Sequence, residues 1–252
     1  MQYDKRSFWG SLTPVTTQLL IINVLMWLAT IAFGRAGIVD LQRLLGLHFW
    51  KGSDFGVWQM FTYMFMHDTN GITHIFVNMF SLWMFGVTLE RVLGSKRYLI
   101  YYIVCGLGAG IAQELMWHFT WQNILAGSVS TTAGFGSVKD IIEAINQGRA
   151  DFTLDQFFNS MVTVGASGAV VGILLAFGML FPNLPLYIIP IPFPIKAKWM
   201  VLGYGVLELF FGISGKMSGF AHFAHLGGMI TGLLLILYWK YNGTLRRGNG
   251  YY

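Results

Sequence analysis

"TVGASGAVVGILLAFGML", residues 163–180, places the polar Ser167 between glycines at the start of a long apolar run. Gly165, Gly168 and Gly172 would each lower helix stability by about 1 kcal/mol relative to alanine. A segment that only had to cross a lipid bilayer would be richer in leucine. We therefore expect that this segment needs a hydroxyl group and the close approach of a second backbone.

The composition of the chain is that of a polytopic membrane protein. Of its 252 residues, 55% are hydrophobic and 11% are charged, and the mean hydropathy is +0.57. A soluble domain carries about 25% charged residues. No polar linker divides the chain, so we predict one all-α membrane domain over residues 1–252. Six spans close to the roughly 20 residues that a bilayer requires are predicted at 15–33, 74–93, 98–117, 165–181, 199–213 and 222–239.

The positions of lysine and arginine predict the orientation of these spans. With a cytoplasmic N-terminus, ten Lys and Arg residues fall in inside segments and six in outside segments, although the outside loops are longer. The positive-inside rule therefore predicts that both termini are cytoplasmic, and we expect a multi-pass protein of the cell membrane. The same flanking charges explain the pI of about 9.3 and give no reason to expect nucleic acid as a partner. The single cysteine, Cys105, lies within a span and is interpreted as a small buried apolar residue.

The first two long loops differ in character. Residues 34–73 mix aromatic and charged side chains, which indicates a segment lying in the membrane interface. In the loop at 118–162, capping-box patterns open two short apolar-periodic stretches, so we expect two short surface helices there. That loop is too polar for us to expect a buried core. The two patterns are Ser137-Val-Lys-Asp140 and Thr153-Leu-Asp-Gln156.

Two later loops are shaped by proline and glycine. Five of the six prolines fall between Pro182 and Pro194, which excludes a helix and predicts a turn. The loop at 214–221 is short and glycine-rich. Together with the short fifth span, we expect it to act as a lid over a site at this end of the molecule.

The pattern around Ser167 occurs twice in the chain. Gly165-Ala-Ser-Gly168 opens the fourth span, and Gly212-Ile-Ser-Gly215 lies at the predicted mobile loop. A nucleophile must be held by rigid neighbours, so Ser167 is favoured over Ser214 as a candidate nucleophile.

The sixth span supplies a partner for this serine. His225 lies three and seven residues before two glycines, which therefore share its helical face. Stripes of small residues let two helices approach closely in lipid, and the fourth span carries a matching stripe. Docking the two stripes would bring Ser167 within hydrogen-bonding reach of His225, as a nucleophile and its base require. The predicted packing residues are Gly168, Gly172, Gly228 and Gly232.

The second span adds two uncharged hydrogen-bond donors. His74 and Asn78 are spaced i, i+4, so both side chains lie on one face, level with Ser167. Two neutral donors directed at one point would suit the oxyanion of an acyl transfer. The alternative is that both side chains pair with interfacial water or with the backbone.

A metal site is a further alternative. His222 and His225 are spaced i, i+3, and His74 lies at the same end of the molecule, so three histidines could bind a metal ion. No carboxylate falls at ligand spacing in these spans, and the serine would then have no role. We therefore predict neither a metal nor a cofactor.

Together these residues resemble the rhomboid family of intramembrane serine proteases. The resemblance implies that Ser167 is the nucleophile and His225 the general base of a dyad without a third acid. It also implies that the Ser167 N–H and the side chains of His74 and Asn78 hold the oxyanion, and that the substrates are membrane-spanning proteins. The matching segments are His74-x-x-x-Asn78, Glu90-Arg-Val-Leu-Gly-Ser95, Gly165-Ala-Ser-Gly168 and Ala224-His-Leu-Gly-Gly228.

The chain departs from the family pattern in two places. Many members have an aromatic residue four positions after the serine, where this chain has Val171, so another aromatic residue is needed to support the histidine. Many members also carry a Trp-Arg pair in the first loop, where this chain has Trp50-Lys51 and Trp58-Gln59.

Two rival functions bear on the same residues. A silent rhomboid-like protein that binds transmembrane clients would have lost the serine or the histidine, and both are present here. A channel or transporter would show an internal repeat, and we find none.

Because hydrolysis needs water, a protease also requires a water-accessible cavity. We expect its lining residues to be His74, Asn78, Ser167 and His225.

Overall fold

Helices suited to crossing a membrane make up most of the computed structural model, which describes residues 13–129, 137–187, 192–214 and 221–245. Within those residues, five helices are long and apolar enough to span a bilayer. A sixth apolar helix, α9 (Ser167–Leu180), has only 14 residues. The predicted all-α multi-pass architecture is therefore confirmed. The five long helices are α2 (Pro14–Arg35), α5 (Thr73–Leu93), α6 (Ser95–Val129), α10 (Ala197–Ser214) and α11 (His222–Tyr241).

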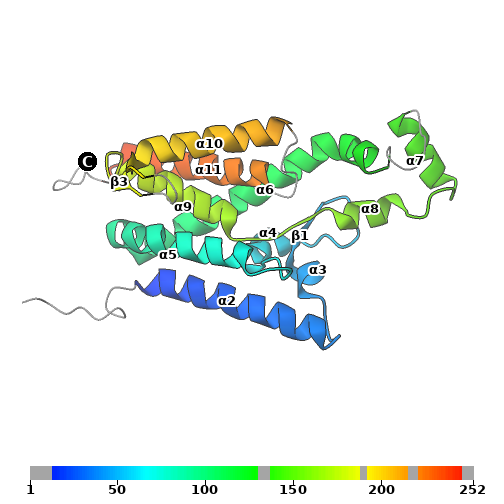
Figure 1. The fold of residues 1–252 in the computed structure, drawn as a ribbon, viewed down its shortest axis with the longest axis horizontal. Coiled ribbons are helices and arrows are strands. Elements are labelled where there is room, and N and C mark those ends of the chain that lie inside the picture. The colour runs from blue at the N-terminus through cyan, green and yellow to red at the C-terminus, as the bar shows by residue number, and fades with distance from the viewer. Residues whose placement is uncertain (1–12, 130–136, 188–191, 215–220, 246–252) are drawn as a thin grey trace, which may run out of the picture.

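The short helix α9 lies at the centre of the bundle. It contacts α5, α6, α10 and α11, and most of its residues are buried (Figure 1). At 1.5 Å per residue, 14 residues extend about 21 Å, which is less than the roughly 30 Å of a bilayer core. One end of α9 therefore lies inside the membrane thickness. We call the end of the bundle nearest Ser167 the serine side, and the end nearest Pro182 the proline side.

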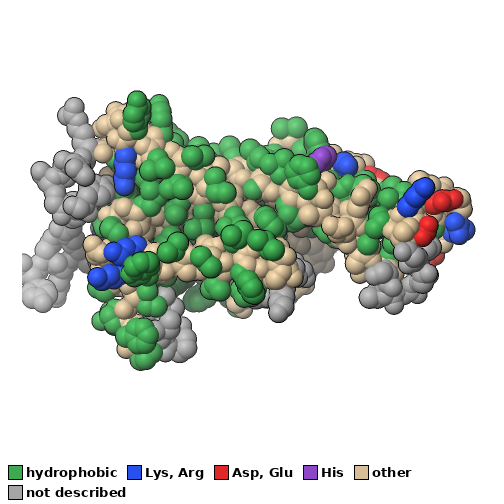
Figure 2. All heavy atoms as spheres, turned by 90° about the horizontal axis from the view of Figure 1, so that it is seen from above, with side chains coloured by type: hydrophobic (Ala, Val, Ile, Leu, Met, Phe, Trp, Pro, Cys, Tyr) green, Lys and Arg blue, Asp and Glu red, His purple; other side chains and the backbone are tan. Residues whose placement is uncertain are grey.

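Hydrophobic and charged side chains occupy different positions along the long axis of the molecule. Figure 2 shows a face on which hydrophobic side chains cover the middle of the bundle. Lysine and arginine gather toward one end of this face, and charges of both signs gather at the other. A wide apolar belt between polar ends is the surface that a bilayer requires.

The serine side is covered by short elements. One short strand on this side, β2 (Val162–Thr163), lies just ahead of α9 and pairs antiparallel with β1 (Leu47–His48). Thr163 therefore lies opposite Leu47, and the chain is held on its way into Ser167. The other short elements from the first loop are α3 (Leu41–Leu45), α4 (Gln59–Thr62) and the 3-10 helix η1 (Tyr63–Phe65).

The predicted capping boxes mark real helices. Ser137 accepts a hydrogen bond from the Asp140 N–H and caps α7 (Val138–Asn146). Thr153 and Gln156 form a reciprocal capping box at the start of α8 (Leu154–Ser160).

Two predictions for this region were wrong. The third span was expected to end at residue 117, but α6 continues to Val129 and projects beyond the bundle (Figure 1). The stretch was also expected to lack a core, yet α7 and α8 bury an apolar face against the extended α6. A helix outside the membrane can bury one face of a polar sequence when a partner helix is present. This second core contains Phe49, Trp117, Leu125, Ile141, Ile145, Phe157 and Met161.

The proline side closes with a short hairpin. Strands β3 (Pro185–Leu186) and β4 (Ile195–Lys196) pair antiparallel, and the described residues between Pro182 and Pro194 contain no helix, as predicted. Residues 188–191 lie outside the described part of the chain. The glycine-rich loop expected to act as a lid also lies outside it, apart from its two ends.

A buried carboxylate links three helices near the proline side. Glu90 of α5 is 2% exposed and accepts hydrogen bonds from the backbone N–H groups of Val15 and Thr16, at 3.0 and 2.8 Å. The hydroxyls of Thr16 and Ser95 donate to the same carboxylate. Glu90 therefore satisfies the free N–H groups at the start of α2 and holds α2 to the α5–α6 junction.

Candidate active site

The structure places Ser167 and His225 in direct contact. Ser167 is the first residue of α9, and His225 lies in the first turn of α11. Ser167 Oγ is 2.8 Å from His225 Nε2, and the histidine is 7% exposed. A serine hydroxyl that donates to an unprotonated imidazole nitrogen has the geometry of an activated nucleophile.

The turn before Ser167 depends on Gly165. This residue has φ +134°, a backbone conformation that residues with a side chain rarely adopt. Its N–H donates to the carbonyl of Tyr63 at 3.0 Å. A Cβ at Gly165 would lie 3.0 Å from His74 Nε2 and 3.5 Å from Ser167 Oγ. The glycine therefore lets the backbone pass directly beneath His74 as it enters α9.

Small residues bring α9 and α11 together, with a contribution from α6 that the sequence did not reveal. A Cβ on Gly228 would meet the backbone of Gly168, with the Gly168 carbonyl carbon only 2.8 Å away. A Cβ on Gly172 would meet Cys105 of α6 and would also lie 3.1 Å from the Gly228 carbonyl oxygen of α11. The contacts of Gly168 with Ala109 and of Gly232 with Tyr101 and Cys105 also involve α6. The small residues therefore form a junction of three helices.

His74 presents a hydrogen-bond donor to the site. Its Nδ1 accepts a hydrogen bond from the Asp68 N–H at 3.2 Å. A neutral imidazole has one protonated nitrogen, so the proton is on Nε2, the atom that faces Gly165 and the serine. This tautomer is the one that an oxyanion donor requires.

Asn78 lies one turn further along α5 and is buried. Its amide nitrogen donates to the carbonyl of His74 at 2.9 Å, which matches the backbone pairing left open as an alternative. The amide nitrogen carries a second hydrogen that this bond does not use. The Ser167 N–H also lies at the start of a helix, where N–H groups lack helical partners and the dipole favours negative charge.

An acid accompanies the Ser167–His225 pair, contrary to our expectation. Glu208 of α10 has Oε1 2.9 Å from His225 Nδ1 and Oε2 2.6 Å from His222 Nδ1. The sequence carried a signal for it, because Glu208 is the only acidic residue within the apolar helix α10. Ionisable residues inside a membrane span are usually functional.

The aromatic neighbour of His225 also comes from α10. Val171, at the position where many rhomboids carry an aromatic residue, is buried in α9. Tyr204 has its hydroxyl 3.4 Å from His225 Nδ1, and the two ring centroids are 6.4 Å apart at a tilt of 39°. Tyr204 and Glu208 are one helical turn apart, so both side chains lie on the face of α10 that meets α11.

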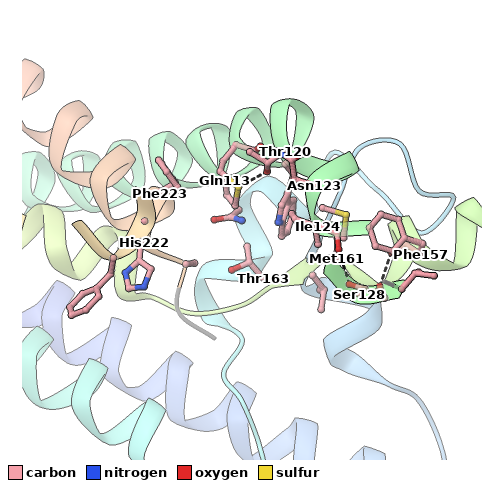
Figure 3. A pocket seen from close by; sticks show the side chains of 18 of the residues that line it. Gln113, Thr120, Asn123, Ile124, Ser128, Phe157, Met161, Thr163, His222 and Phe223 are labelled. Carbon is pink, nitrogen blue, oxygen red and sulfur yellow. Dashed lines mark hydrogen bonds between the residues drawn. The ribbon is translucent and has the colours of Figure 1, made fainter. Parts of the chain in front are cut away.

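A cavity of about 1030 Å³ opens beside the site, between the extension of α6, α8 and the start of α11 (Figure 3). The four residues expected to line a water cavity do not line this one. It approaches the site at His222 and Thr163 instead. Its walls also include Gln113, Thr120, Phe157 and Phe223.

The three histidines weighed as metal ligands are arranged differently from a metal site. His222 and His225 both face Glu208, while His74 is bonded to the backbone of Asp68. Within the described ranges, no three His, Cys, Asp or Glu side chains are arranged to hold a metal ion.

Comparison with known proteins identifies the family. The rhomboid domain matches residues 54–242, three quarters of the chain. Rhomboid protease AarA of Providencia stuartii is 25% identical over 239 residues, covering 92% of this chain and 74% of that protein. RHOMBOID-like protein 4 of Arabidopsis thaliana is 25% identical, covering 90% of this chain but 44% of that protein.

A third relative, rhomboid protease GlpG of Salmonella choleraesuis, is 30% identical over 122 residues, which cover 48% of this chain and 42% of that protein. The chain therefore spans most of one of these three relatives and less than half of the other two. The matched region contains the second through sixth predicted spans and every candidate site residue. This chain belongs to the rhomboid family, whose members are generally intramembrane serine proteases.

Proposed function

We propose that this protein is an intramembrane serine endopeptidase that cleaves membrane-spanning proteins, with Ser167 as nucleophile and His225 as general base. The observation that carries the proposal is the 2.8 Å contact between Ser167 Oγ and His225 Nε2 at the buried end of α9. Membership of the rhomboid family supports it independently.

The reaction is an acyl transfer in two halves. Ser167 Oγ attacks the peptide carbonyl carbon while its proton passes to His225 Nε2, and the carbonyl oxygen becomes an oxyanion. The Ser167 N–H, His74 Nε2–H and the Asn78 amide are the donors that would face this charge. His225 then gives its proton to the leaving nitrogen and the C–N bond breaks. In the second half, His225 takes a proton from water as the water oxygen attacks the ester, and it returns this proton to Ser167 Oγ as the C–Oγ bond breaks and the carboxylic acid leaves.

The substrate must reach the serine as an extended chain. A transmembrane helix offers no free peptide group, because its carbonyls are paired within the helix. The cavity beside His222 and Thr163 is large enough to receive an unwound segment on the serine side. Cleavage is therefore expected where a substrate helix begins or is easily unwound.

The proposal is tested with a fluorophosphonate probe on the purified full-length protein in detergent. We expect a stoichiometric adduct on Ser167, located by mass spectrometry of the modified peptide, and no adduct on a heat-denatured sample. An adduct on Ser214, or none on a folded sample, would contradict the proposal. Binding of a transmembrane helix without labelling or cleavage would favour the silent client-binding function.

Asn78→Ala is expected to lower kcat for a single-span reporter by roughly 10²–10³-fold, about 3–4 kcal/mol, as for other lost oxyanion donors. KM should change less, because the oxyanion exists only near the transition state. His74→Ala should act in the same direction, with a smaller loss if water replaces the imidazole. The measurement is kcat, KM and thermal stability on one purified sample of each variant.

A matched control for Asn78 is available in α2. Asn23 is also buried and donates to the carbonyl four residues earlier, Leu19, at 2.7 Å. Asn23→Ala removes the same kind of bond far from the serine and should affect stability alone. Equal effects of the two substitutions on kcat would assign Asn78 a packing role.

A further inference from the structure

Glu208 forms a bridge between two histidines of α11. Its two carboxylate oxygens lie 2.9 Å from His225 Nδ1 and 2.6 Å from His222 Nδ1. The three side chains are 8–9% exposed, so water contributes little around them. An ionised carboxylate only accepts hydrogen bonds, so both imidazoles donate their Nδ1–H to it.

This arrangement determines which nitrogen of His225 can act as a base. With the proton on Nδ1, Nε2 is unprotonated and can accept the Ser167 proton across 2.8 Å. When that proton arrives, the imidazolium lies against a carboxylate in a poorly hydrated site, where electrostatic attraction is strong. Glu208 accepts a hydrogen bond from His225 Nδ1, as the acid of a Ser-His-Asp triad does from its histidine. The acid lies on α10 and the histidine on α11.

His222 gives the carboxylate a fixed position. A buried charge needs hydrogen-bond partners, and His222 occupies the oxygen that His225 leaves free. The ring of Phe211 lies 5.8 Å from the His222 ring, at a tilt of 31°, and packs against it. Glu208 is therefore held from both sides, and rotation away from His225 would break its bond to His222.

Within the part of the chain that the structure describes, few other titratable groups surround His225. Tyr204 of α10 places its hydroxyl 3.4 Å from Nδ1, and Ser167 of α9 faces Nε2. From α5, His74 directs its Nε2 at Gly165, two residues before Ser167. From α6, Tyr101 and Cys105 face Gly232, two helical turns along α11. Among the groups of the described residues that face the ring, Glu208 is thus the one that supplies negative charge.

Resting on the proposed function, we infer that Glu208 is a positioning residue for catalysis. It holds His225 in the tautomer that can deprotonate Ser167, it stabilises the imidazolium formed in the reaction, and it is itself fixed by His222. Glu208 keeps its negative charge throughout. In the acylation half, the proton moves from Ser167 Oγ to His225 Nε2 and from there to the leaving nitrogen.

The test is Glu208→Gln in the full-length protein, measured by the rate of fluorophosphonate labelling of Ser167. This rate reports activation of the serine without requiring a known substrate. We expect a decrease of about 10²–10³-fold at neutral pH. The loss should be below the roughly 10⁴-fold seen in kcat when a triad acid becomes an amide, because labelling releases fluoride, which needs no proton from His225. Glu208→Asp should recover part of the lost rate.

Rescue by the shorter acid separates positioning from structural support. Glu208→Asp keeps a carboxylate that can accept from His225 Nδ1, so its labelling rate should exceed that of Glu208→Gln. A role limited to holding α10 against α11 would lower the melting temperature of both variants and leave the labelling rate of the folded protein near the wild-type value.

Glu90→Gln is the matched control, because it makes the same chemical change at a second buried carboxylate. Glu90 pairs with α2 and Ser95 rather than with histidine, so this variant should lose stability while its folded protein is labelled at the wild-type rate. A Glu208→Gln protein that is labelled at the wild-type rate, or a Glu208→Asp protein that is labelled no faster than Glu208→Gln, would overturn the inference while the proposed function stands. Failure of the folded wild type to be labelled at Ser167 would overturn the proposed function itself.

Discussion

Ser167→Ala is expected to lower cleavage of a single-span transmembrane reporter by about 10⁴–10⁶-fold, the range seen when a nucleophile is removed from a nucleophile–base pair. The substitution removes one hydroxyl and its bond to His225, and alanine fits the space at the start of α9. The melting temperature should therefore change little. The measurement is product formation with purified protein in proteoliposomes, with thermal stability followed on the same preparation.

Three companion variants test this result further. Ser214→Ala changes the serine of the second Gly-x-Ser-Gly pattern, and we expect full cleavage. His225→Ala should be as inactive as Ser167→Ala, and the double variant should be no worse, because the two residues act as one unit. Cleavage retained by Ser167→Ala and lost in Ser214→Ala would show that the other serine is the nucleophile.

The spans were predictable because membrane helices are governed by one strong physical term. Long apolar stretches must satisfy their backbone groups internally, so hydropathy reveals them almost without regard to packing. The end of α6 was not predictable in this way. Beyond Trp117 the helix continues outside the apolar belt, and its stability there comes from the side chains of α7 and α8 packed against it. Such contacts depend on tertiary structure and leave no hydropathy signal.

The candidate site was likewise predictable in part, where the sequence carried a local signal, and not where contacts depend on tertiary structure. Ser167 and His225 stood out because each lies in a short glycine-bounded motif, and small residues facing each other suggested which helices meet. Glu208 was visible as an acid in an apolar span, but its partners were not, since they lie on the next helix, 14 and 17 residues further along the chain. The register between α10 and α11 decides that contact. Spacing within a single helix cannot predict that register.

The part played by α6 was hidden for a related reason. The glycines of α9 and α11 suggested a two-helix contact, yet Gly172 and Gly232 both face Cys105 on α6. Tyr101 of the same helix donates its hydroxyl to the carbonyl of Gly172 at 2.8 Å. A glycine shows that something comes close without showing what does. Here the same residue of α9, Gly172, lies against both α6 and α11.

Gly228→Leu is expected to abolish cleavage and fluorophosphonate labelling, each by at least about 10³-fold. A Cβ at Gly228 would meet the main chain of Gly168, which, unlike a flexible side chain, cannot move aside. The helices must then separate, and about 1 Å of misplacement already costs roughly 10²-fold in rate. Gly203 of α10 has open space where a Cβ would stand, so Gly203→Leu is the matched control and should retain activity.

Measuring thermal stability tests whether the lost activity of Gly228→Leu comes from the separation of α9 and α11. Separation of α9 from α11 removes buried contacts, so the melting temperature of this variant should fall, while that of Gly203→Leu should stay near the wild-type value. Labelling should be lost even in the fraction that remains folded, because Ser167 and His225 are carried by the two helices that are pushed apart. Wild-type labelling of Ser167 in Gly228→Leu would show that the Gly168–Gly228 contact does not set the distance between the serine and the histidine.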